Sequence, residues 1–434
     1  MFNPREAALN SLIKWESQSS FSNIEINTVI SRQKAEKNDI SLYTLLFLGV
    51  IEKKMLLDSI IDEYSKIPIS KIEETTKNIL RLGLYQLLFT DKIPEYSAVS
   101  ESVNLADKRS KGFVNAILRS FIRADKKYTL PESEWERISI ENSIPAGMIE
   151  IFRSSYGDET SKALCTLPPQ KSHISLRVNI LKANEDELIL KIKEVGYSAV
   201  SSQIAKDIVK TDAPISILQT YLDEGLCFVQ DESSRISSMV VGATPGDIIA
   251  DVCACPGGKT FSMSIDMQNK GEIYSSDLHE NKLSLISKGA KKLGIDIINT
   301  KAQNAKEFLP EYEGKFDKVL CDVPCSGLGV IFKKPDIKYK EIDNIKALPS
   351  VQYDILNNCA KYVKKGGILV YSTCTLNALE NEKNVEKFME SNPEFEEVDF
   401  QIGEIKSIKG GYTFFPHVNQ TDGFYVKKMR RKND

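Results

Sequence analysis

The sequence lacks any apolar stretch that is long enough to cross a membrane. Its longest nearly continuous apolar run, Leu42–Ile51, covers ten residues and includes Thr44 and Gly49, whereas a membrane-spanning helix needs about 20 apolar residues. The first residues, MFNPREAALNSL, also lack the basic stretch and apolar core of a secretory signal. We therefore expect a cytoplasmic protein that has no membrane partner.

The sequence also lacks a large excess of one charge and any CxxC pair, and it contains few histidines. The 57 Lys and Arg residues nearly balance the 60 Asp and Glu residues, and the net charge of -3 does not by itself predict a polyanionic partner. No CxxC pair occurs, and none of the three histidines lies at zinc-ligand spacing from a cysteine pair. We expect no structural metal. The eight cysteines are expected to be reduced thiols, because no leader directs the chain to an oxidising compartment.

The first part of the chain, residues 1–130, predicts an all-helical domain. Apolar residues recur there at helical spacing after Asn3-Pro4 and in Leu42–Ile61, Ile79–Phe89 and Phe113–Ile122, with breaks at Pro68 and Pro94. The stretch from Asp107 to Lys127 holds seven Lys and Arg residues against two Asp residues. This charge fits either a solvated helix face or a phosphate-binding surface.

The rest of the chain alternates between predicted strands and helices. Residues 135–225 predict a small α+β module, with strands at 174–178 and 197–200 around a helix at 184–195. Within residues 226–434, short β-rich runs at 248–252, 272–276, 318–322 and 368–372 precede turns and helices such as 281–293. This alternation predicts an α/β domain with a mostly parallel, Rossmann-like sheet and helices on both faces. Ligands of such a sheet lie beyond the carboxyl ends of its strands.

The turn after the first of these strands contains two glycines, Gly257 and Gly258, which allow a ligand to approach the backbone closely. Its spacing is neither that of a phosphate-binding GxxxxGK[ST] loop nor that of a dinucleotide-binding GxGxxG turn. Asp277 ends the next strand, nineteen residues after Gly258, and its position suits hydrogen bonds to ribose hydroxyls. Together these features favour an adenosine-containing cofactor over a structural turn and a surface carboxylate.

Cysteines follow two further strands. Asp322 and Cys325 come after the strand at 318–322, and Cys374 comes after the strand at 368–372. A single cysteine in such a place is usually a small core residue. Two cysteines and one carboxylate at the same edge of a sheet favour a reactive site instead.

Three short strings give the chain a resemblance to a known family. The strings CACPGGK (253–259), DVPCSG (322–327) and STCT (372–375) resemble those of the S-adenosylmethionine-dependent RNA cytosine-C5 methyltransferases, and residues 229–233 resemble the segment that opens their catalytic domain. Residues 98–103 and 113–118 resemble the helical RNA-binding domain of the antitermination factor NusB. This order of domains resembles that of the bacterial 16S ribosomal RNA methyltransferases called the RsmB, Sun or Fmu family, and the resemblance covers essentially the whole chain.

The resemblance implies roles for three site residues. Cys374 would add to C6 of a cytosine, which makes C5 nucleophilic enough to accept a methyl group. Asp322 would bind the pyrimidine near N3, and Cys325 would assist the collapse of the covalent adduct. A free thiol is only a few per cent ionised at pH 7, so we expect a positive environment or a strand-to-helix turn to lower the pKa of Cys374.

The resemblance also implies S-adenosyl-L-methionine as the cofactor. Asp277 would hold the ribose, and Asp322 would approach the amino-acid end of the cofactor as well as the base. Asn304 stands where the family usually has an acidic residue near the adenine amine, and Cys255 stands where alanine is more usual. The turn that wraps the cofactor would consist of Cys253, Ala254, Cys255, Pro256, Gly257, Gly258 and Lys259.

The implied partner is small-subunit ribosomal RNA, with a flipped-out cytosine as the target, and the chain is expected to act as a monomer. Basic residues expected to contact RNA are those at 108–127, Lys333, Lys334, Lys338, Lys340, Lys427, Lys428, Arg430, Arg431 and Lys432. Three alternatives stay open: the same chemistry on transfer RNA, a non-catalytic RNA-binding or antitermination protein, and a nucleotide-dependent oxidoreductase. The three site residues disfavour the second, and the missing GxGxxG turn disfavours the third.

Overall fold

The computed structural model describes residues 2–18, 22–32, 36–168 and 173–433. Contacts divide the chain into two compact units, Met1–Leu167 with Ile331–Lys340, and Pro168–Val330 with Glu341–Asp434. We expected the helical domain to end near residue 130 and a separate module to begin near residue 135. The helical unit instead continues to Leu167 and includes a segment from the second half of the chain.

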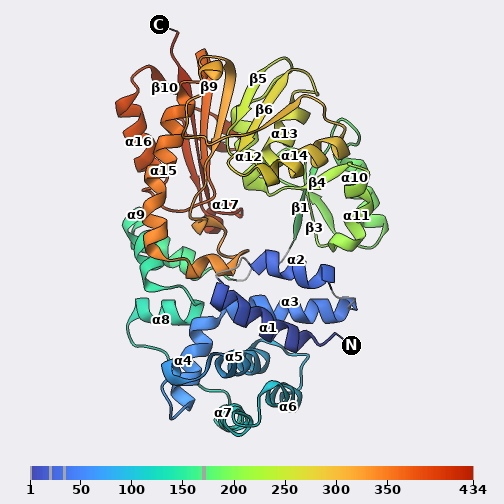
Figure 1. Cartoon of the computed structure of the whole chain (residues 1–434), viewed down its shortest axis with the longest axis vertical. Coiled ribbons are helices and arrows are strands. Elements are labelled where there is room, and N and C mark those ends of the chain that lie inside the picture. The colour runs from blue at the N-terminus through green and yellow to red at the C-terminus, as the bar shows by residue number, and fades with distance from the viewer. Residues whose placement is uncertain (1, 19–21, 33–35, 169–172, 434) are drawn as a thin grey trace. The chain divides into compact units, whose positions relative to one another are not determined.

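The secondary structure of the first unit is helical throughout its described residues, and the part before Leu167 is blue to teal in Figure 1. Pro68 and Pro94 stand immediately before helical turns, as the sequence predicted. The core-facing residues of the basic helix, Val114, Ile117 and Phe121, follow the helical period. The α-helices are α1 (Pro4–Gln18), α2 (Ser22–Arg32), α3 (Lys37–Glu52), α4 (Lys54–Tyr64), α5 (Glu74–Phe89), α6 (Glu95–Leu105), α7 (Lys111–Arg123), α8 (Glu134–Asn142) and α9 (Ala146–Cys165).

The stretch Leu42–Ile61, predicted as one helix, contributes to two. Lys53 separates α3 from α4 because its backbone leaves the helical region, with φ at -108° and ψ at 15°. The hydroxyl of Ser143, which follows α8, accepts hydrogen bonds from Met55 N (3.1 Å) and Leu56 N (3.2 Å) in the first turn of α4. These bonds attach the α8–α9 turn to α4 and are one reason why the helical unit extends beyond residue 130.

The second unit contains a small antiparallel sheet with two helices within residues 174–229. Of these elements, the strand at 174–178, the helix at 184–195 and a strand near 197–200 were predicted. The side chain of Asn184 accepts a hydrogen bond from Glu187 N at 2.8 Å and so begins α10 where the sequence placed it. The strand order is β2-β3-β1-β4. The elements are β1 (Ile174–Val178), α10 (Glu185–Glu194), β2 (Ala199–Ser201), β3 (Ile208–Thr211), α11 (Ile215–Asp223) and β4 (Cys227–Val229).

The larger sheet of this unit is mostly parallel, which confirms the predicted fold class. Its order is β10-β14-β9-β8-β5-β6-β7, with β13 paired to β14. Pairings among β5 to β9 are parallel, and β14 is antiparallel to β9. The strands are β5 (Ile248–Asp251), β6 (Glu272–Asp277), β7 (Ile298–Ala302), β8 (Phe316–Asp322), β9 (Val363–Thr373), β10 (Phe395–Glu397), β13 (Gly411–Phe414) and β14 (Phe424–Arg431); a separate pair is β11 (Gln401–Ile402) and β12 (Ile405–Lys406).

Helices cover both faces of the larger sheet. Neighbouring residues of β9, Leu369 and Val370, belong to separate apolar clusters because side chains of a strand alternate between its faces. The cluster with Leu369 includes α15 and α16, whereas the cluster with Val370 includes α12 and α13 (Figure 1). The helices are α12 (Glu232–Val241), α13 (Gly258–Asp266), α14 (Glu280–Leu293), α15 (Ile342–Ala360), α16 (Glu382–Ser391) and the short α17 (Pro416–Asn419).

Candidate active site

The thiols of Cys325 and Cys374 lie in contact, with their sulfur atoms 3.2 Å apart. Cys374 directly follows β9 and is exposed, and Cys325 follows β8 by three residues and is partly exposed. Because β8 and β9 are parallel neighbours, their carboxyl ends reach the same edge of the sheet. The structure therefore confirms that the two thiols meet at this edge.

Their surroundings differ. Contact with the Cys374 sulfur raises the pKa of Cys325 well above its ordinary value, and burial and the nearby charges of Glu380 and Asp322 raise it further. Cys325 is therefore a neutral thiol at neutral pH. Of the two sulfurs, that of Cys374 is the more accessible to a large substrate.

Asp322, at the end of β8, accepts hydrogen bonds on both carboxylate oxygens. Lys259 Nζ lies 2.5 Å from Oδ2, and Ser372 Oγ donates to Oδ1 at 2.7 Å. Burial lowers the pKa of Lys259, but Asp322, and to a smaller extent Cys374, raise it above its ordinary value. Lys259 was predicted only as part of the cofactor turn, and the structure places it on Asp322 as well.

The glycine turn between β5 and α13 needs glycine at its centre. Gly257 has a φ of 111°, and a Cβ atom there would lie 2.7 Å from the ring of Phe261. Gln230 fixes the turn, since its Nε2 donates to Gly258 O at 2.9 Å and its Oε1 accepts from Ser262 Oγ at 2.6 Å. Gln230 lies within residues 229–233, for which the sequence indicated a family resemblance but no individual role.

Asp277, at the end of β6, lies directly against this turn. Its carboxylate accepts hydrogen bonds from Cys255 N at 3.3 Å and from His279 N at 3.1 Å. Burial and the neighbouring Asp277 raise the pKa of Cys255 to about 12. Cys253, Ala254, Pro256 and Gly258 complete the turn, which Ala254 N joins to Ser276 O at 2.9 Å. The predicted turn and Asp277 are thus adjacent.

Asp251 lies beneath the turn and was not among the predicted site residues. Its Oδ2 accepts a hydrogen bond from Thr260 Oγ1 at 2.7 Å, whereas its Oδ1 is buried without a hydrogen-bond partner among the described residues. Burial is the main cause that raises the pKa of Asp251 to about 7. The signal in the sequence was its position near the end of the predicted strand at 248–252, before a glycine turn.

Asn304 lies two residues after β7 and is partly buried. Its Nδ2 donates to Glu307 Oε1 at 2.9 Å, and its Oδ1 accepts from Lys306 N at 3.2 Å. An amide oxygen has two lone pairs, so one acceptor position is still available to a ligand. Contact between Asn304 and adenine stays a prediction.

Two lysines that we expected to contact RNA are buried, and that prediction is wrong for them. Lys338 donates to Asn142 O at 3.1 Å, and burial lowers its pKa to about 8. Lys427 lies on β14, where its Nζ contacts Glu397 at 2.7 Å and Lys409 O. The basic residues that are exposed include Lys108, Arg109, Lys111, Arg119, Arg123 and Lys127 around α7, and Lys333, Lys334, Arg430 and Lys432 elsewhere.

Within the part of the chain that the structure describes, no group of three or more His, Cys, Asp or Glu side chains is arranged to hold a metal ion. The helices of the described residues include none that combines the length and the apolar character needed to span a membrane.

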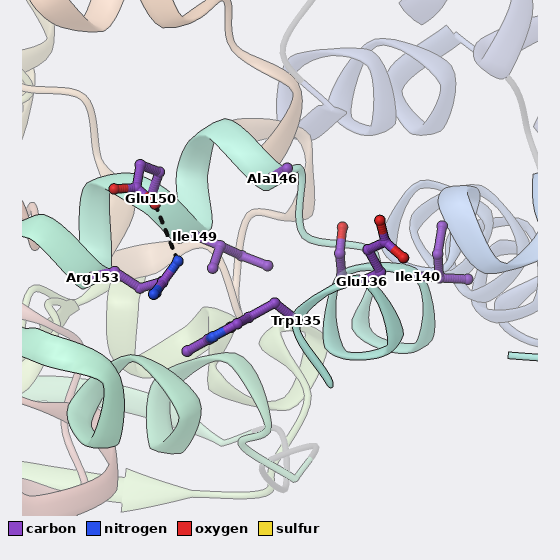
Figure 2. Close-up of a pocket in the computed structure, with 8 residues that line it drawn as sticks. Trp135, Glu136, Ile140, Ala146, Ile149, Glu150 and Arg153 are labelled. Atoms are coloured by element: carbon purple, nitrogen blue, oxygen red, sulfur yellow. Dashed lines mark hydrogen bonds and ion pairs between the residues drawn. The ribbon is translucent and has the colours of Figure 1, made fainter. Parts of the chain in front are cut away.

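A cavity of about 220 Å³ lies within the helical unit, between α8 and α9. Figure 2 shows Trp135 at this cavity, with Arg153 near its ring and a contact between Arg153 and Glu150. The Arg153 guanidinium lies 4.7 Å from the centre of the indole ring. No predicted site residue lines this cavity.

The mostly parallel sheet, its glycine turn and an Asp at the end of the next strand define a Rossmann-like protein of the methyltransferase type. The family model of the 16S rRNA methyltransferases RsmB/F matches residues 238–430, and the model of the NusB family matches residues 2–123. The probable ribosomal RNA small subunit methyltransferase B of Bacillus subtilis (strain 168) is 34% identical over 99% of this chain and 98% of its own. This chain belongs to the RsmB/F family of 16S rRNA methyltransferases, which confirms the resemblance found in its sequence.

Other relatives agree with this assignment. The ribosomal RNA small subunit methyltransferase B of Klebsiella pneumoniae (strain 342) is 30% identical over 93% of both chains. The crystal structure of PH0851 matches with a TM-score of 0.82 and 26% identity over 99% of both chains. A methyltransferase homolog protein from Pyrococcus horikoshii matches with a TM-score of 0.57 and 28% identity, over 65% of this chain and 93% of its own.

Proposed function

We propose that this protein transfers a methyl group from S-adenosyl-L-methionine to C5 of a specific cytosine in small-subunit ribosomal RNA. The observation that carries the proposal is the 3.2 Å contact between Cys325 and Cys374, at the sheet edge where Asp322 also lies. One cytosine ring can approach all three groups there. The small-subunit RNA is the substrate named for the Bacillus subtilis relative.

Cys374 begins the reaction, because its sulfur is the more exposed of the two. Its thiolate forms a bond to C6 of the cytosine, and the electron pair of the C5–C6 double bond becomes available at C5. Asp322 binds the N3 side of the ring, and Lys259 offsets negative charge that develops there, since it contacts Asp322. C5 would then accept the electrophilic methyl group that bound S-adenosyl-L-methionine would supply.

Cys325 completes the reaction as an acid and then as a base. Its raised pKa keeps a proton on the thiol until the C6–sulfur bond breaks. The proton then passes to the Cys374 sulfur across the contact between them. As that proton moves, the Cys325 sulfur takes the proton from C5. The C5–H electron pair forms the restored C5–C6 double bond, and the C6–sulfur pair leaves with Cys374.

The residues of the turn fit an adenosine cofactor. Gly257 leaves room for close approach, Asp277 lies at the strand end beside it, and the buried Asp251 Oδ1 has no partner among the described residues. When bound, S-adenosyl-L-methionine supplies an electrophilic methyl group. The residues that would hold it are Cys253, Ala254, Cys255, Pro256, Gly257, Gly258, Lys259, Asp277, Asn304 and Asp322.

The decisive experiment compares Cys374→Ala and Cys325→Ala with the wild type on 16S ribosomal RNA and on transfer RNA. We expect Cys374→Ala to abolish 5-methylcytosine while it binds RNA normally. We expect Cys325→Ala to remain covalently attached to RNA, as a slow band on a denaturing gel. Methylation by Cys374→Ala would overturn the proposal, and 5-methylcytosine in transfer RNA alone would change the substrate.

The exposed basic face of α7 would supply phosphate contacts. Replacement of both Arg119 and Arg123 by Gln removes two exposed cations, and we expect the slope of log K against log salt to fall by about 1.5–2. Lys427→Gln is the matched control, because this lysine is buried against Glu397, and it should leave the slope unchanged. An unchanged slope in the double variant would remove α7 from the RNA-binding surface.

A further inference from the structure

The carboxylate of Glu380 is fully buried in the segment between β9 and α16. Its Oε2 accepts hydrogen bonds from Ser326 N at 2.9 Å and from Gln352 Nε2 at 2.8 Å. Its Oε1 accepts from Ser326 Oγ and from Asn377 Nδ2, the latter at 2.9 Å. Among the described residues, Glu380 forms no ion pair, so neutral donors alone satisfy this carboxylate.

These hydrogen bonds connect the chain segments that follow the two cysteines. Ser326 is the residue after Cys325, and both its backbone N–H and its hydroxyl bind Glu380. The Ser326 hydroxyl also lies 2.6 Å from the hydroxyl of Thr375, the residue after Cys374. One buried carboxylate therefore fixes the backbone beside Cys325 to the segment that begins at Cys374.

A buried charge without a cationic partner is costly, and apolar residues of similar size often stabilise a fold as well or better. Stability therefore gives little reason for a glutamate at this position. Its charge also acts on the site itself, because it is one of the causes that raise the pKa of Cys325. Cys374, Asp322 and Tyr371 are the other titratable groups coupled to this thiol.

Glu380 supports Cys325 more than Cys374. The backbone of Cys374 has its own attachments, because it follows β9 directly and its carbonyl accepts from Gly329 N at 3.2 Å. Asn381 holds the next residue, since its Nδ2 donates to Thr375 O at 2.9 Å. The backbone after Cys325, by contrast, donates its first N–H to the Glu380 carboxylate.

We propose that Glu380 is a positioning residue that holds Cys325 against Cys374, and that it acts in the collapse of the covalent adduct rather than in its formation. This inference rests on the proposed function. It predicts that loss of the carboxylate reproduces, in weaker form, the loss of the Cys325 thiol.

Glu380→Gln tests the inference, because it keeps the size of the side chain but offers one acceptor oxygen to four donors. We expect the variant to bind RNA and to form the adduct, but to release product about 10- to 100-fold more slowly. The enzyme–RNA band on a denaturing gel should therefore increase at steady state, and in the double variant with Cys325→Ala the band should increase no further. Glu382→Gln is the matched control, since Glu382 contacts Thr413 rather than either cysteine segment, and it should show no increase.

Ser326→Ala gives a second test with a smaller change, because it removes the hydroxyl but keeps the backbone N–H bond to Glu380. We expect the enzyme–RNA adduct to accumulate in Ser326→Ala as well, but to a several-fold smaller amount than in Glu380→Gln. If both variants release product at the wild-type rate, or if both lose RNA binding and adduct formation together, the positioning role is refuted. If Cys325→Ala also forms no adduct and the wild type makes no 5-methylcytosine, the proposed function fails instead.

Discussion

Replacement of Arg177 by Met should destabilise the second unit through a buried ion cluster. The Arg177 side chain is fully buried, and its guanidinium lies 3.1 Å from Asp207 and 3.0 Å from Asp266. Asp266 belongs to α13, whereas Arg177 belongs to β1, so the cluster joins the small sheet to a helix that packs on the larger sheet. Breaking a buried ion pair costs about 3–5 kcal/mol. Because Arg235 still contacts both carboxylates, we expect the lower value, about 3 kcal/mol.

The assay has to report on the second unit alone. Both tryptophans, Trp15 and Trp135, lie in the helical unit, so their fluorescence does not follow it. The buried thiols of Cys321 and Cys359 lie in the second unit and become accessible when it unfolds. Pulse labelling of these thiols during heating therefore measures the unfolding of the second unit. A loss of about 3 kcal/mol corresponds to a fall in Tm of about 6–12 °C.

The control for this experiment is Lys292→Met, which removes an exposed ion pair with Asp223 in the same unit. Exposed pairs contribute about 0–1 kcal/mol, so this variant should label at nearly the wild-type temperature. If Arg177→Met shifts the labelling midpoint no more than Lys292→Met does, the buried cluster does not stabilise the unit and the reasoning is refuted.

Three further predictions concern single residues. Lys259→Met should lower kcat in a labelled-methyl assay by about 100-fold or more, while the Tm stays nearly constant. A kcat within threefold of the wild-type value would exclude Lys259 from charge stabilisation at Asp322. Gly257→Ala should weaken cofactor binding in calorimetry, because its φ of 111° and the Phe261 ring leave no room for Cβ; unchanged affinity would count against the turn as the cofactor site. Lys338 has a pKa of about 8 in the folded state against 10.5, so it binds fewer protons folded than unfolded and the helical unit gains stability as pH rises from about 8 to 10.5. Lys338→Met should abolish this gain in stability, which urea unfolding followed by tryptophan fluorescence measures at several pH values. The same pH dependence of stability in the wild type and the variant would contradict the lowered pKa of Lys338.

The sheet and its site residues could be predicted because they depend on local pattern. Each parallel strand is a short β-rich run that ends at a glycine, proline or polar turn, and parallel strands bring those turns to one edge. Asp277, Asp322 and Cys374 could therefore be placed before the structure was known. The contact of Cys325 with Cys374 followed from the same rule.

Other features depend on tertiary contacts that have no local signal. Nothing in the local sequence distinguishes Glu380 from an exposed glutamate. Only the structure shows that it is buried and that it accepts hydrogen bonds from four donors in three different segments. Lys338 and Lys427 were expected at an RNA surface because each lies in a locally basic stretch of the sequence. Lys338 instead finds a carbonyl acceptor inside the helical unit, and Lys427 lies in β14, a strand that the charge of the C-terminal segment concealed.

The different tasks proposed for the two cysteines follow from their neighbours, since both side chains are chemically the same. A nucleophile needs access to the base and a nearby positive charge, and Cys374 is exposed and interacts with Lys259. A proton donor needs to keep its proton, and Cys325 lies among Cys374, Glu380 and Asp322, which all raise its pKa. Lys259 comes from the glycine turn after β5, Cys325 from the segment after β8, and both Cys374 and Glu380 from the segment after β9. The division of roles therefore depends on three strand ends that meet at one edge.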